Sequence, residues 1–496
     1  MRHPRLLAAF LLTPLLAGCF ASTGGGGEAS EGEDGSRLRV ALAFPPAENL
    51  SPYGADATIL SRLGVTEGLT ILDANGAAAP ALAASWRRED DRTWLFTLRE
   101  AVFQDGTEVT PAAVAASLAH ATRAEPAPAA LAGVTLTAKA KGSAGVRITT
   151  TEPDPVLPLR LSSPSLAVLS PKAYEEKDAV DPAGTATGPF ELTEVTGAGA
   201  AGLDRFDDYW GGRAQASGID ARFIADGTAR ANALRTGQVD VAEAIPVAQV
   251  AGLDADTRRE TPTTRTTSLL LNTDSGIFED PALRAAARAA VDTSAFARGV
   301  YEGHADAGAG IYGPAVTWAE GNRVKPAHRA EAGDPDGASL TLATYDNRPE
   351  LPEAAQVLKQ QLENAGFTVK LEVREYSRLE SDALAGKFDA FVLARNTLVD
   401  TGDPVAVLAS DFTCDGGYNI AQVCTPAVDR AVAEAQAVAD TGKRQQAALA
   451  AEAAVLGTDA VVPLAHQRVI TGVAAEVDGV LLDPYERTLV GAGTRR

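Results

Sequence analysis

The chain is poor in cysteine, methionine, basic residues and long apolar runs. It has 496 residues but three cysteines and one methionine, and its formal net charge is −21. Such an acidic chain repels phosphate backbones and anionic headgroups, which argues against a nucleic-acid partner and against direct adhesion to anionic lipid. After Leu16 no apolar run approaches the roughly 20 residues that a membrane-spanning helix needs.

Motifs of several enzyme classes are also missing. The sequence contains no G-x-S-x-G, no H-E-x-x-H and no G-x-x-x-x-G-K-[ST]. The five histidines are scattered, and no second Cys/His pair stands at zinc-binding spacing. We therefore predict a protein that is not an enzyme and that holds no cofactor and no protein-ligated metal site.

The N-terminal region has the composition of an export signal followed by a tether. Arg2 and Arg5 precede a mostly apolar run at residues 6–16, which is too short to cross a bilayer but suits a secretory signal peptide. Glycine-rich and acidic residues follow, and such a sequence behaves as flexible coil. We expect a signal peptide at residues 1–18 and a tether at 19–36.

The apolar run ends in L-A-G-C, which resembles the bacterial lipobox. In lipoproteins with this motif the cysteine becomes the first residue of the mature chain and carries lipid, a role that falls here on Cys19. This resemblance implies an extracytoplasmic body that is anchored to the cell membrane. The alternative is an ordinary secretory signal with a chance cysteine.

The two remaining cysteines, Cys414 and Cys424, lie close together in F-T-C-D-G-G-Y-N-I-A-Q-V-C-T-P. Thiols outside the membrane oxidise, so this turn-rich segment indicates a disulfide. Closing so short a loop contributes about 2.5 kcal/mol in the chain-entropy model. The alternative is a pair of free or metal-binding thiols.

The region after the tether is too long for one typical domain and suggests two or three. Alternation of strands and helices predicts an α/β fold with helices on both faces of a sheet. Trp86 and Trp94 suit the core of a hairpin. The expected strands are residues 37–44, a hairpin at 86–99, 146–150, 185–192, 269–272, 340–344, 368–373 and 388–394. One helix is expected to begin at Pro111 with Thr110 as its N-cap, and another to cover 281–291 with Asp280 as its cap. Further helices are expected at 229–234, 351–365 and 377–385.

Several motifs, in their order along the chain, resemble one family. Together they are similar to the dipeptide, oligopeptide and nickel solute-binding proteins of ABC transporters, which are known as extracellular solute-binding proteins of family 5. The motifs are L-D-A-N-G-A-A-A-P-A-L-A-A-S-W (72–86), W-L-F-T-L-R-E-A-V-F-Q-D-G-T (94–107), G-P-F-E-L (188–192), A-L-R-T-G-Q-V-D (233–240) and V-P-L-A-H-Q-R (462–468). The resemblance covers essentially the whole mature chain.

This resemblance implies a two-lobed clamp like the type II periplasmic binding proteins, with an extra subdomain on the first lobe. Lobe I would comprise residues 37–70, 185–268 and 468–496. The subdomain would be 71–184, and lobe II would be 269–467.

The implied function is that of an extracytoplasmic substrate-binding lipoprotein of an ABC importer. It would capture di- or oligopeptides in a hinged cleft, act as a monomer, and deliver its ligand to permease and ATPase subunits. The alternative within the family is binding of nickel or a metal chelate. A receptor that signals without transport is a further alternative.

The segment A-R-N-T-L-V-D-T-G-D-P (394–404) is similar to the Asp-x-Gly-Asp-Pro of the dipeptide binders, whose first acid pairs with the peptide α-amine. That role falls on Asp400, whereas Asp403 suits a structural role before Pro404. The segment follows a predicted strand, where ligands of α/β sheets gather. The alternative for both acids is capping of a turn.

The matching site for the peptide carboxylate is Arg348 in Y-D-N-R-P, because the family places an Arg-Pro there and a guanidinium grips a carboxylate through two bonds. Its alternative role is that of a solvated loop arginine. Arg395 and Asn396 also lie near the strand end, and Arg395 is the other candidate for the carboxylate. The aromatic candidates for the cleft wall are Tyr53, Tyr312, Trp318 and Tyr376, and the alternative role of each is packing.

Overall fold

The computed structural model describes residues 36–131, 133–176, 179–346, 348–398 and 400–496. The predicted signal peptide, the predicted lipidation site Cys19 and the tether up to residue 35 lie outside the described residues. Within the described ranges, no helix combines the length and apolar character needed to cross a bilayer.

One large sheet runs through most of the described chain. Its strands follow the order β15-β14-β16-β12-β17-β11-β1-β10-β9-β8, and the short β13 pairs with β17 outside this path. The strands are β1 (Leu38–Leu42), β8 (Phe190–Thr196), β9 (Ala200–Arg205), β10 (Gly218–Phe223), β11 (Val241–Ala242), β12 (Arg258–Leu271), β13 (Ala305–Ala307), β14 (Ser339–Tyr345), β15 (Thr368–Arg374), β16 (Ala390–Asn396) and β17 (Val461–Val473).

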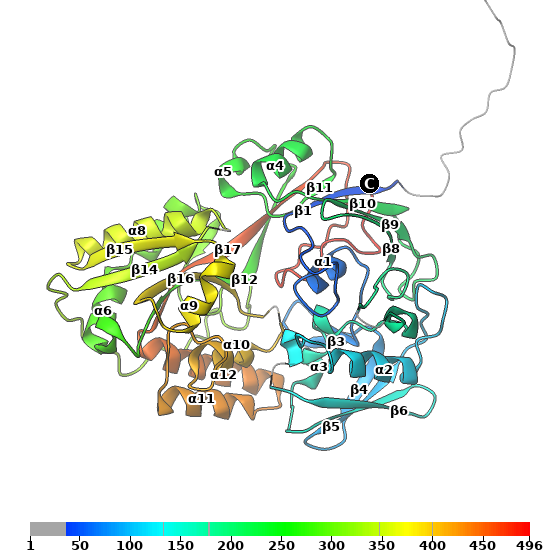
Figure 1. Cartoon of the computed structure of the whole chain (residues 1–496), viewed down its shortest axis with the longest axis horizontal. Helices are drawn as coiled ribbons and strands as arrows, with labels where there is room; N and C mark the ends of the chain where they lie inside the picture. Colours follow the sequence, from blue (N-terminus) through cyan, green and yellow to red (C-terminus); the bar gives the residue numbers. More distant parts are fainter. Residues whose placement is uncertain (1–35, 132, 177–178, 347, 399) are drawn as a thin grey trace, which may run out of the picture. The chain divides into compact units, whose positions relative to one another are not determined.

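Two long antiparallel strands, β12 and β17, lie side by side in the middle of this sheet (Figure 1). β12 also pairs with β16, and β17 also pairs with β11, so these two strands join the β14–β16 group to the group around β1. The expectation of a short strand at 269–272 was wrong in length. The buried threonines before Leu269 gave no apolar signal. The predicted lobe boundaries at 268 and 467 fall inside these strands and stay predictions.

The alternation predicted between residues 340 and 394 is confirmed. β14 pairs in parallel with β15 and β16, which requires crossover connections such as α8 (Glu350–Asn364). α8 buries one apolar face that includes Leu351, Leu358 and Leu362. The helix ends before Gly366, whose φ of 101° suits glycine.

A second sheet with the order β4-β5-β7-β6 has its own core. α2 (Pro111–Ala121) packs on β6 and β7, and its predicted cap is confirmed, because the Thr110 hydroxyl accepts a hydrogen bond from Ala113 N at 3.2 Å. A separate hairpin pairs β2 with β3. These strands are β2 (Thr70–Leu72), β3 (Ala78–Pro80), β4 (Ala83–Arg88), β5 (Thr93–Leu98), β6 (Leu136–Lys141) and β7 (Gly145–Thr150).

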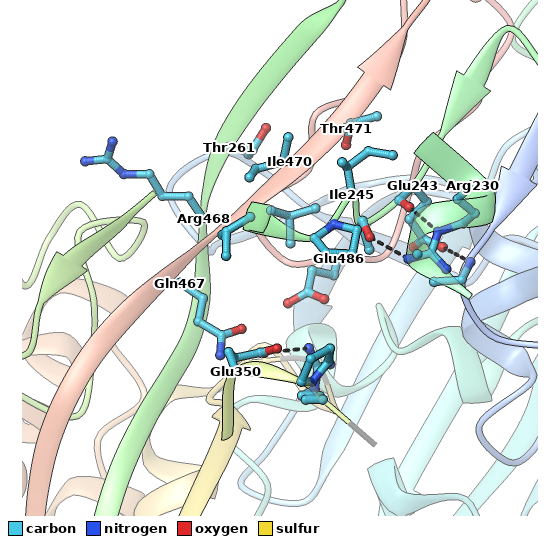
Figure 2. Close-up of a pocket in the computed structure, with 18 of the residues that line it drawn as sticks. Arg230, Glu243, Ile245, Thr261, Glu350, Gln467, Arg468, Ile470, Thr471 and Glu486 are labelled. Carbon is cyan, nitrogen blue, oxygen red and sulfur yellow. Dashed lines mark hydrogen bonds and ion pairs between the residues drawn. The ribbon is translucent and has the colours of Figure 1, made fainter. Parts of the chain in front are cut away.

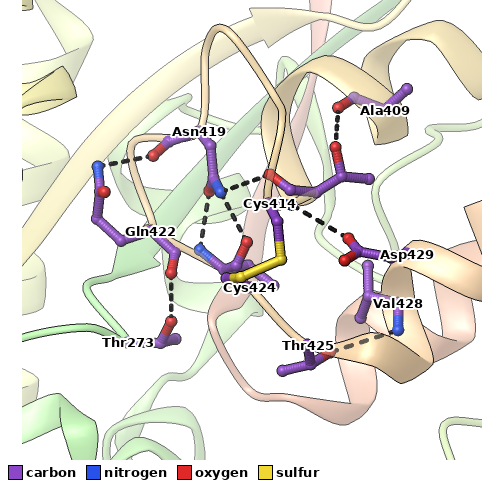
Figure 3. The surroundings of a disulfide bond; sticks show 11 residues. Thr273, Ala409, Cys414, Asn419, Gln422, Cys424, Thr425, Val428 and Asp429 are labelled. Atoms are coloured by element: carbon purple, nitrogen blue, oxygen red, sulfur yellow. Dashed lines mark hydrogen bonds between the residues drawn. A yellow bond between two sulfur atoms is a disulfide. The ribbon is translucent and has the colours of Figure 1, made fainter.

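Three helices near the C-terminus, α10 (Pro404–Phe412), α11 (Pro426–Gln436) and α12 (Thr441–Gly457), pack against one another. Between α10 and α11 the structure joins Cys414 to Cys424 in a disulfide (Figure 3). Hydrogen bonds hold the same loop, because Asn419 Nδ2 donates to Val423 O at 2.7 Å and Asp429 accepts from Cys414 N at 3.1 Å. The other helices named below are α1 (Ala57–Arg62), α3 (Leu157–Arg160), α4 (Gly227–Arg235), α5 (Val247–Val250) and α6 (Pro281–Ala290).

His466 lies buried in the middle of β17, opposite Thr266 of β12. Its Nε2 accepts a hydrogen bond from Ala309 N at 3.2 Å. The proton therefore sits on Nδ1, which donates to Thr266 Oγ1 at 2.9 Å. That hydroxyl in turn donates to Ile311 O at 2.8 Å. This series of hydrogen bonds uses both ring nitrogens of a neutral imidazole.

Acid should weaken the fold through His466. Burial lowers its pKa to about 4, and the charge of Arg323 acts in the same direction. An unfolded histidine has a pKa of about 6.5. In the window between these values the unfolded chain binds more protons, so the free energy of unfolding decreases as the pH falls, by about 2 kcal/mol at pH ~5. Urea unfolding of the purified protein near neutrality and near pH ~5 measures the loss.

The matched variant is His466→Asn, whose amide nitrogen takes the place of Nδ1 and still donates to Thr266 without titrating. On acidification, we expect the free energy of unfolding of the variant to decrease by about 2 kcal/mol less than that of the parent. Equal acid sensitivity in the two proteins would contradict this role of His466.

Candidate functional site

A cavity of about 290 Å³ opens where β17 passes between β1 and the start of α8. The residues that line it come from segments far apart in the sequence, among them the segment just after β1, the start of α5, strand β17 and the turn before the C-terminus. Figure 2 shows that charged side chains line its wall. They are Arg62, Arg230, Glu243, Glu302, Arg348, Glu350, Glu353, Arg468, Asp483 and Glu486.

Glu486 is the centre of the charged wall. Its carboxylate accepts two bonds from Arg265, from Nε at 3.2 Å and from Nη2 at 3.3 Å. Asn396 Nδ2 donates to the same carboxylate at 3.2 Å. Arg62 Nε donates to the Glu486 carbonyl oxygen at 2.8 Å, and its Nη1 pairs with Glu243 at 2.5 Å. This network links β12, β16, α1 and the C-terminal turn.

The charges of this network keep Glu486 ionised. Burial alone would raise its pKa, but the guanidinium groups of Arg265, Arg62 and Arg348 outweigh burial and lower the pKa to about 2. A carboxylate with several guanidinium partners tolerates burial because each partner supplies charge and hydrogen bonds.

The turn that carries Glu486 is fixed by its own backbone bonds. Asp483 accepts from the backbone N–H groups of Tyr485, Arg487 and Thr488 at 2.9, 2.7 and 3.0 Å. Glu486 itself has a φ of 60°, in the left-handed region that non-glycine residues seldom adopt. No sequence motif pointed to this residue, because D-P-Y-E-R (483–487) is typical only of a turn.

Arg348, the predicted carboxylate ligand, lines the cavity. Its ion pair with Glu350 spans 3.9 Å, and 26% of its side chain is exposed. The neighbouring positive charge of Arg265, followed by burial, lowers the pKa of Arg348. Because the charge of Arg265 disfavours the charged form of Arg348, an anionic group beside Arg348 would be stabilising.

Arg395 is already paired. Its Nε and Nη2 donate to the carboxylate of Asp411 at 3.0 and 3.3 Å, and its guanidinium lies 4.7 Å from the ring centre of Tyr418. Against the effect of burial, Asp411 and Asp400 raise the pKa of Arg395. Asn396 points to Glu486 and also accepts from Thr264 Oγ1 at 2.7 Å.

Asp400, the predicted amine ligand, is more open than its neighbours. It lies 3.9 Å from Arg395, and 43% of its side chain is exposed. Asp403 has the structural role expected for it, because it caps α10 by accepting from Val405 N at 3.2 Å. Arg444 holds its carboxylate through two bonds of 2.7 and 2.6 Å in a buried pair.

The aromatic candidates lie in different places. Tyr312 is fully buried, and its hydroxyl donates to Pro404 O at 2.7 Å. Trp318 packs on Tyr312 with ring centres 5.4 Å apart and lines a second cavity. Tyr376 donates to Glu380 at 2.7 Å and meets Tyr345 edge-on. Tyr53 packs against the core of the second sheet. None of these four residues is among those lining the charged cavity, within the part of the chain that the structure describes.

No group of three or more histidine, cysteine, aspartate or glutamate residues is arranged to hold a metal ion in the described ranges. The side chains that line the charged cavity can bind and orient charged groups of a ligand. The arrangement supplies guanidinium groups for an anion and carboxylates for a cation within one wall.

Comparison with known proteins identifies relatives of this chain. The family model "Bacterial extracellular solute-binding proteins, family 5 Middle" matches residues 77–419. The glutathione-binding protein GsiB of Salmonella typhi is 29% identical over 342 residues, which cover 65% of this chain. GsiB of Escherichia coli O157:H7 is 29% identical over 344 residues with the same coverage. The aligned part spans 66% of the length of these relatives, just under two thirds.

Solved structures show the same fold. NikA from Staphylococcus aureus in complex with Ni(L-His)2 has a TM-score of 0.76 at 20% identity and covers 93% of this chain and 100% of its own. NikA from Brucella suis with Fe(III)-EDTA has a TM-score of 0.79 at 22% identity, with 92% and 99% covered. DppA from Helicobacter pylori with peptide STSA has a TM-score of 0.75 at 20% identity, with 93% and 98% covered. The predicted α/β, two-lobed periplasmic-binding-protein fold is confirmed.

Replacing Glu486 with Gln should destabilise the protein strongly. The substitution keeps the shape of the side chain but leaves the buried guanidinium groups of Arg265 and Arg62 without its charge. We expect the free energy of unfolding to decrease by about 3 kcal/mol. Chemical denaturation followed by circular dichroism measures the difference.

The control is Glu353→Gln, which removes an exposed carboxylate from the wall of the same cavity. We expect it to change the free energy of unfolding by less than about 0.5 kcal/mol. If both variants were as stable as the parent, Glu486 would not be the electrostatic centre of the site.

Proposed function

The chain belongs to the bacterial extracellular solute-binding proteins of family 5, and we propose that it is the substrate-binding component of an ABC importer for small peptides. In this proposal, Arg348 binds the peptide α-carboxylate and Asp400 binds the α-amine. Asn396, Arg395 and their partners hold the end of β16 in place. The partners of the protein would be a permease and its ATPase subunits.

The difference between short and long ion pairs carries this proposal. Three carboxylates near the end of β16 and in the charged wall, Asp403, Asp411 and Glu486, each pair with an arginine at 3.2 Å or less. The ion pair of Asp400 with Arg395 and that of Arg348 with Glu350 each span 3.9 Å instead. A charge held by a short, buried pair gains little from a ligand, whereas a loosely paired charge can exchange its partner.

The two loosely paired groups have opposite signs, as the two ends of a peptide do. A guanidinium binds a carboxylate through a planar fork, and a carboxylate binds an ammonium group through charge-assisted bonds. The structure of DppA contains a peptide. GsiB is named as a glutathione-binding protein, and glutathione is itself a small peptide. The relative NikA holds Ni(L-His)2, so a metal chelate is the alternative ligand class.

Calorimetry with peptide pools tests the proposal. We expect di-, tri- or pentapeptides to bind the purified protein, and N-acetylated peptides to lose binding because they lack the charged amine. Asp400→Asn and Arg348→Gln should each weaken binding by about 100-fold, in line with the loss of a charged hydrogen bond.

Glu434→Gln on α11 is the control, because it removes an exposed charge from the same half of the protein without touching the cavity. We expect this variant to bind like the parent. If a nickel–histidine complex gave a heat of binding and no peptide did, the peptide assignment would be rejected in favour of metal-chelate uptake.

We also propose that the body is held at the outer face of the cell membrane by lipid on Cys19, with residues 19–36 as tether. The support is the L-A-G-C sequence at the end of the apolar run. Expression in a bacterial host that processes lipoproteins should place the full chain in the membrane fraction. Cys19→Ser should release it or leave it unprocessed, whereas Ser22→Ala should change nothing. Because an unprocessed precursor can stay at the membrane through its apolar run, incorporation of labelled palmitate is the deciding measurement, and labelling of the Cys19→Ser variant equal to that of the parent would contradict lipid anchoring.

A further inference from the structure

We propose that a second cavity, between the sheet β4–β7 and the helices α10–α12, binds a neutral molecule with one or two aromatic rings. This cavity shares no lining residue with the charged cavity described above, but Leu398, Gly402 and Pro404, from the segment that carries Asp400, line it. Three of the four tryptophans of the chain line it: Trp86, Trp94 and Trp318.

The size of the cavity matches a small ring system. Its volume is about 170 Å³. An apolar cavity of about 150 Å³ in another protein stays free of water and binds benzene. Besides the tryptophans, prolines and aliphatic residues form most of the wall, among them Pro155, Pro158, Leu159 and Leu398. A ring the size of benzene or indole would therefore fill this space and gain aromatic contacts.

The charge of the lining argues for a neutral ligand. Among the described residues that line the cavity, Arg444 is the charged one. Its guanidinium donates to Asp403 and to the carbonyl oxygens of Ala435, Gln436 and Val438. An ionic ligand would lose its hydration without gaining a free partner, whereas a neutral ring avoids that cost.

The tryptophan rings are supported from behind. Trp94 Nε1 donates to Asp154 O at 3.1 Å. The ring of Trp86 lies 6.1 Å from that of Phe96, and Trp318 packs on the buried Tyr312. Rings held in this way need little further ordering when a ligand arrives, which favours binding.

The cavity joins two parts of the chain. Trp318 and α12 form one side, while β3, β4, β5 and the segment around α3 form the other. The two sides come close at Gly76, where an added Cβ would lie 4.0 Å from Trp318 Nε1. A ring bound here contacts both sides, so it would stabilise their contact as well as fill the space.

Fluorine NMR of 5-fluoroindole with the full-length protein tests the proposal. We expect saturable broadening of the ligand signal, reversed by unlabelled indole. Ala78→Leu, which adds a side chain to the lining, should weaken binding at least about tenfold. Ala79→Leu is the matched control, because adjacent side chains of β3 point to opposite faces and Ala79 is not among the lining residues.

Trp318→Leu provides a second variant that keeps an apolar wall but removes one ring, and it should also weaken binding. Arg348→Gln should bind 5-fluoroindole like the parent, so failure of the peptide proposal would leave this result unaffected. Absence of saturable binding in the parent, or equal binding by the Ala78→Leu, Ala79→Leu and Trp318→Leu variants, would overturn the proposal.

Discussion

The antiparallel pairing of β12 with β17 is the constraint on which the rest of the structure depends. These strands are the link within the large sheet between the β14–β16 group and the β1 group. A side-chain hydrogen bond also crosses the pair, since Gln467 Nε2 donates to Thr267 Oγ1 at 2.9 Å. The ladder shifts register between Pro262 and Thr266, where proline cannot donate. Because β17 also forms a wall of the charged cavity, the geometry of that site follows from this pairing.

The protein contains closely paired, buried charges as well as more exposed charges with longer ion pairs. Arg444 with Asp403 and Arg265 with Glu486 are nearly buried and hydrogen-bonded, so losing either partner would leave an isolated charge. Asp400 is more exposed than these groups, and its ion pair is longer. Sequence similarity alone does not make this distinction, because Asp400 and Asp403 stand in one short motif and differ only in their surroundings.

Elements with a local signal were predictable from the sequence. The apolar face of α8 and the Thr110 and Asp280 caps depend on residues within one or two turns. Glu486 gave no such signal, because it meets Arg265 and Arg62 across 221 and 424 positions of the sequence. Trp86 and Trp94 were expected in the core. The structure packs them against that core, but they also line the second cavity, which a hairpin pattern cannot reveal.

A zwitterionic ligand also suits the overall charge of the protein. A net charge of −21 repels an anion from a distance, but a peptide with one positive and one negative end feels little net force. At physiological salt the screening length is about 8 Å, so distant acids contribute little once the ligand is in contact. In the proposed peptide site, selection of the ligand would then rest on the few charged groups within reach and on their separation. A ligand that carries only one of the two charges would leave either Arg348 or Asp400 without a new partner.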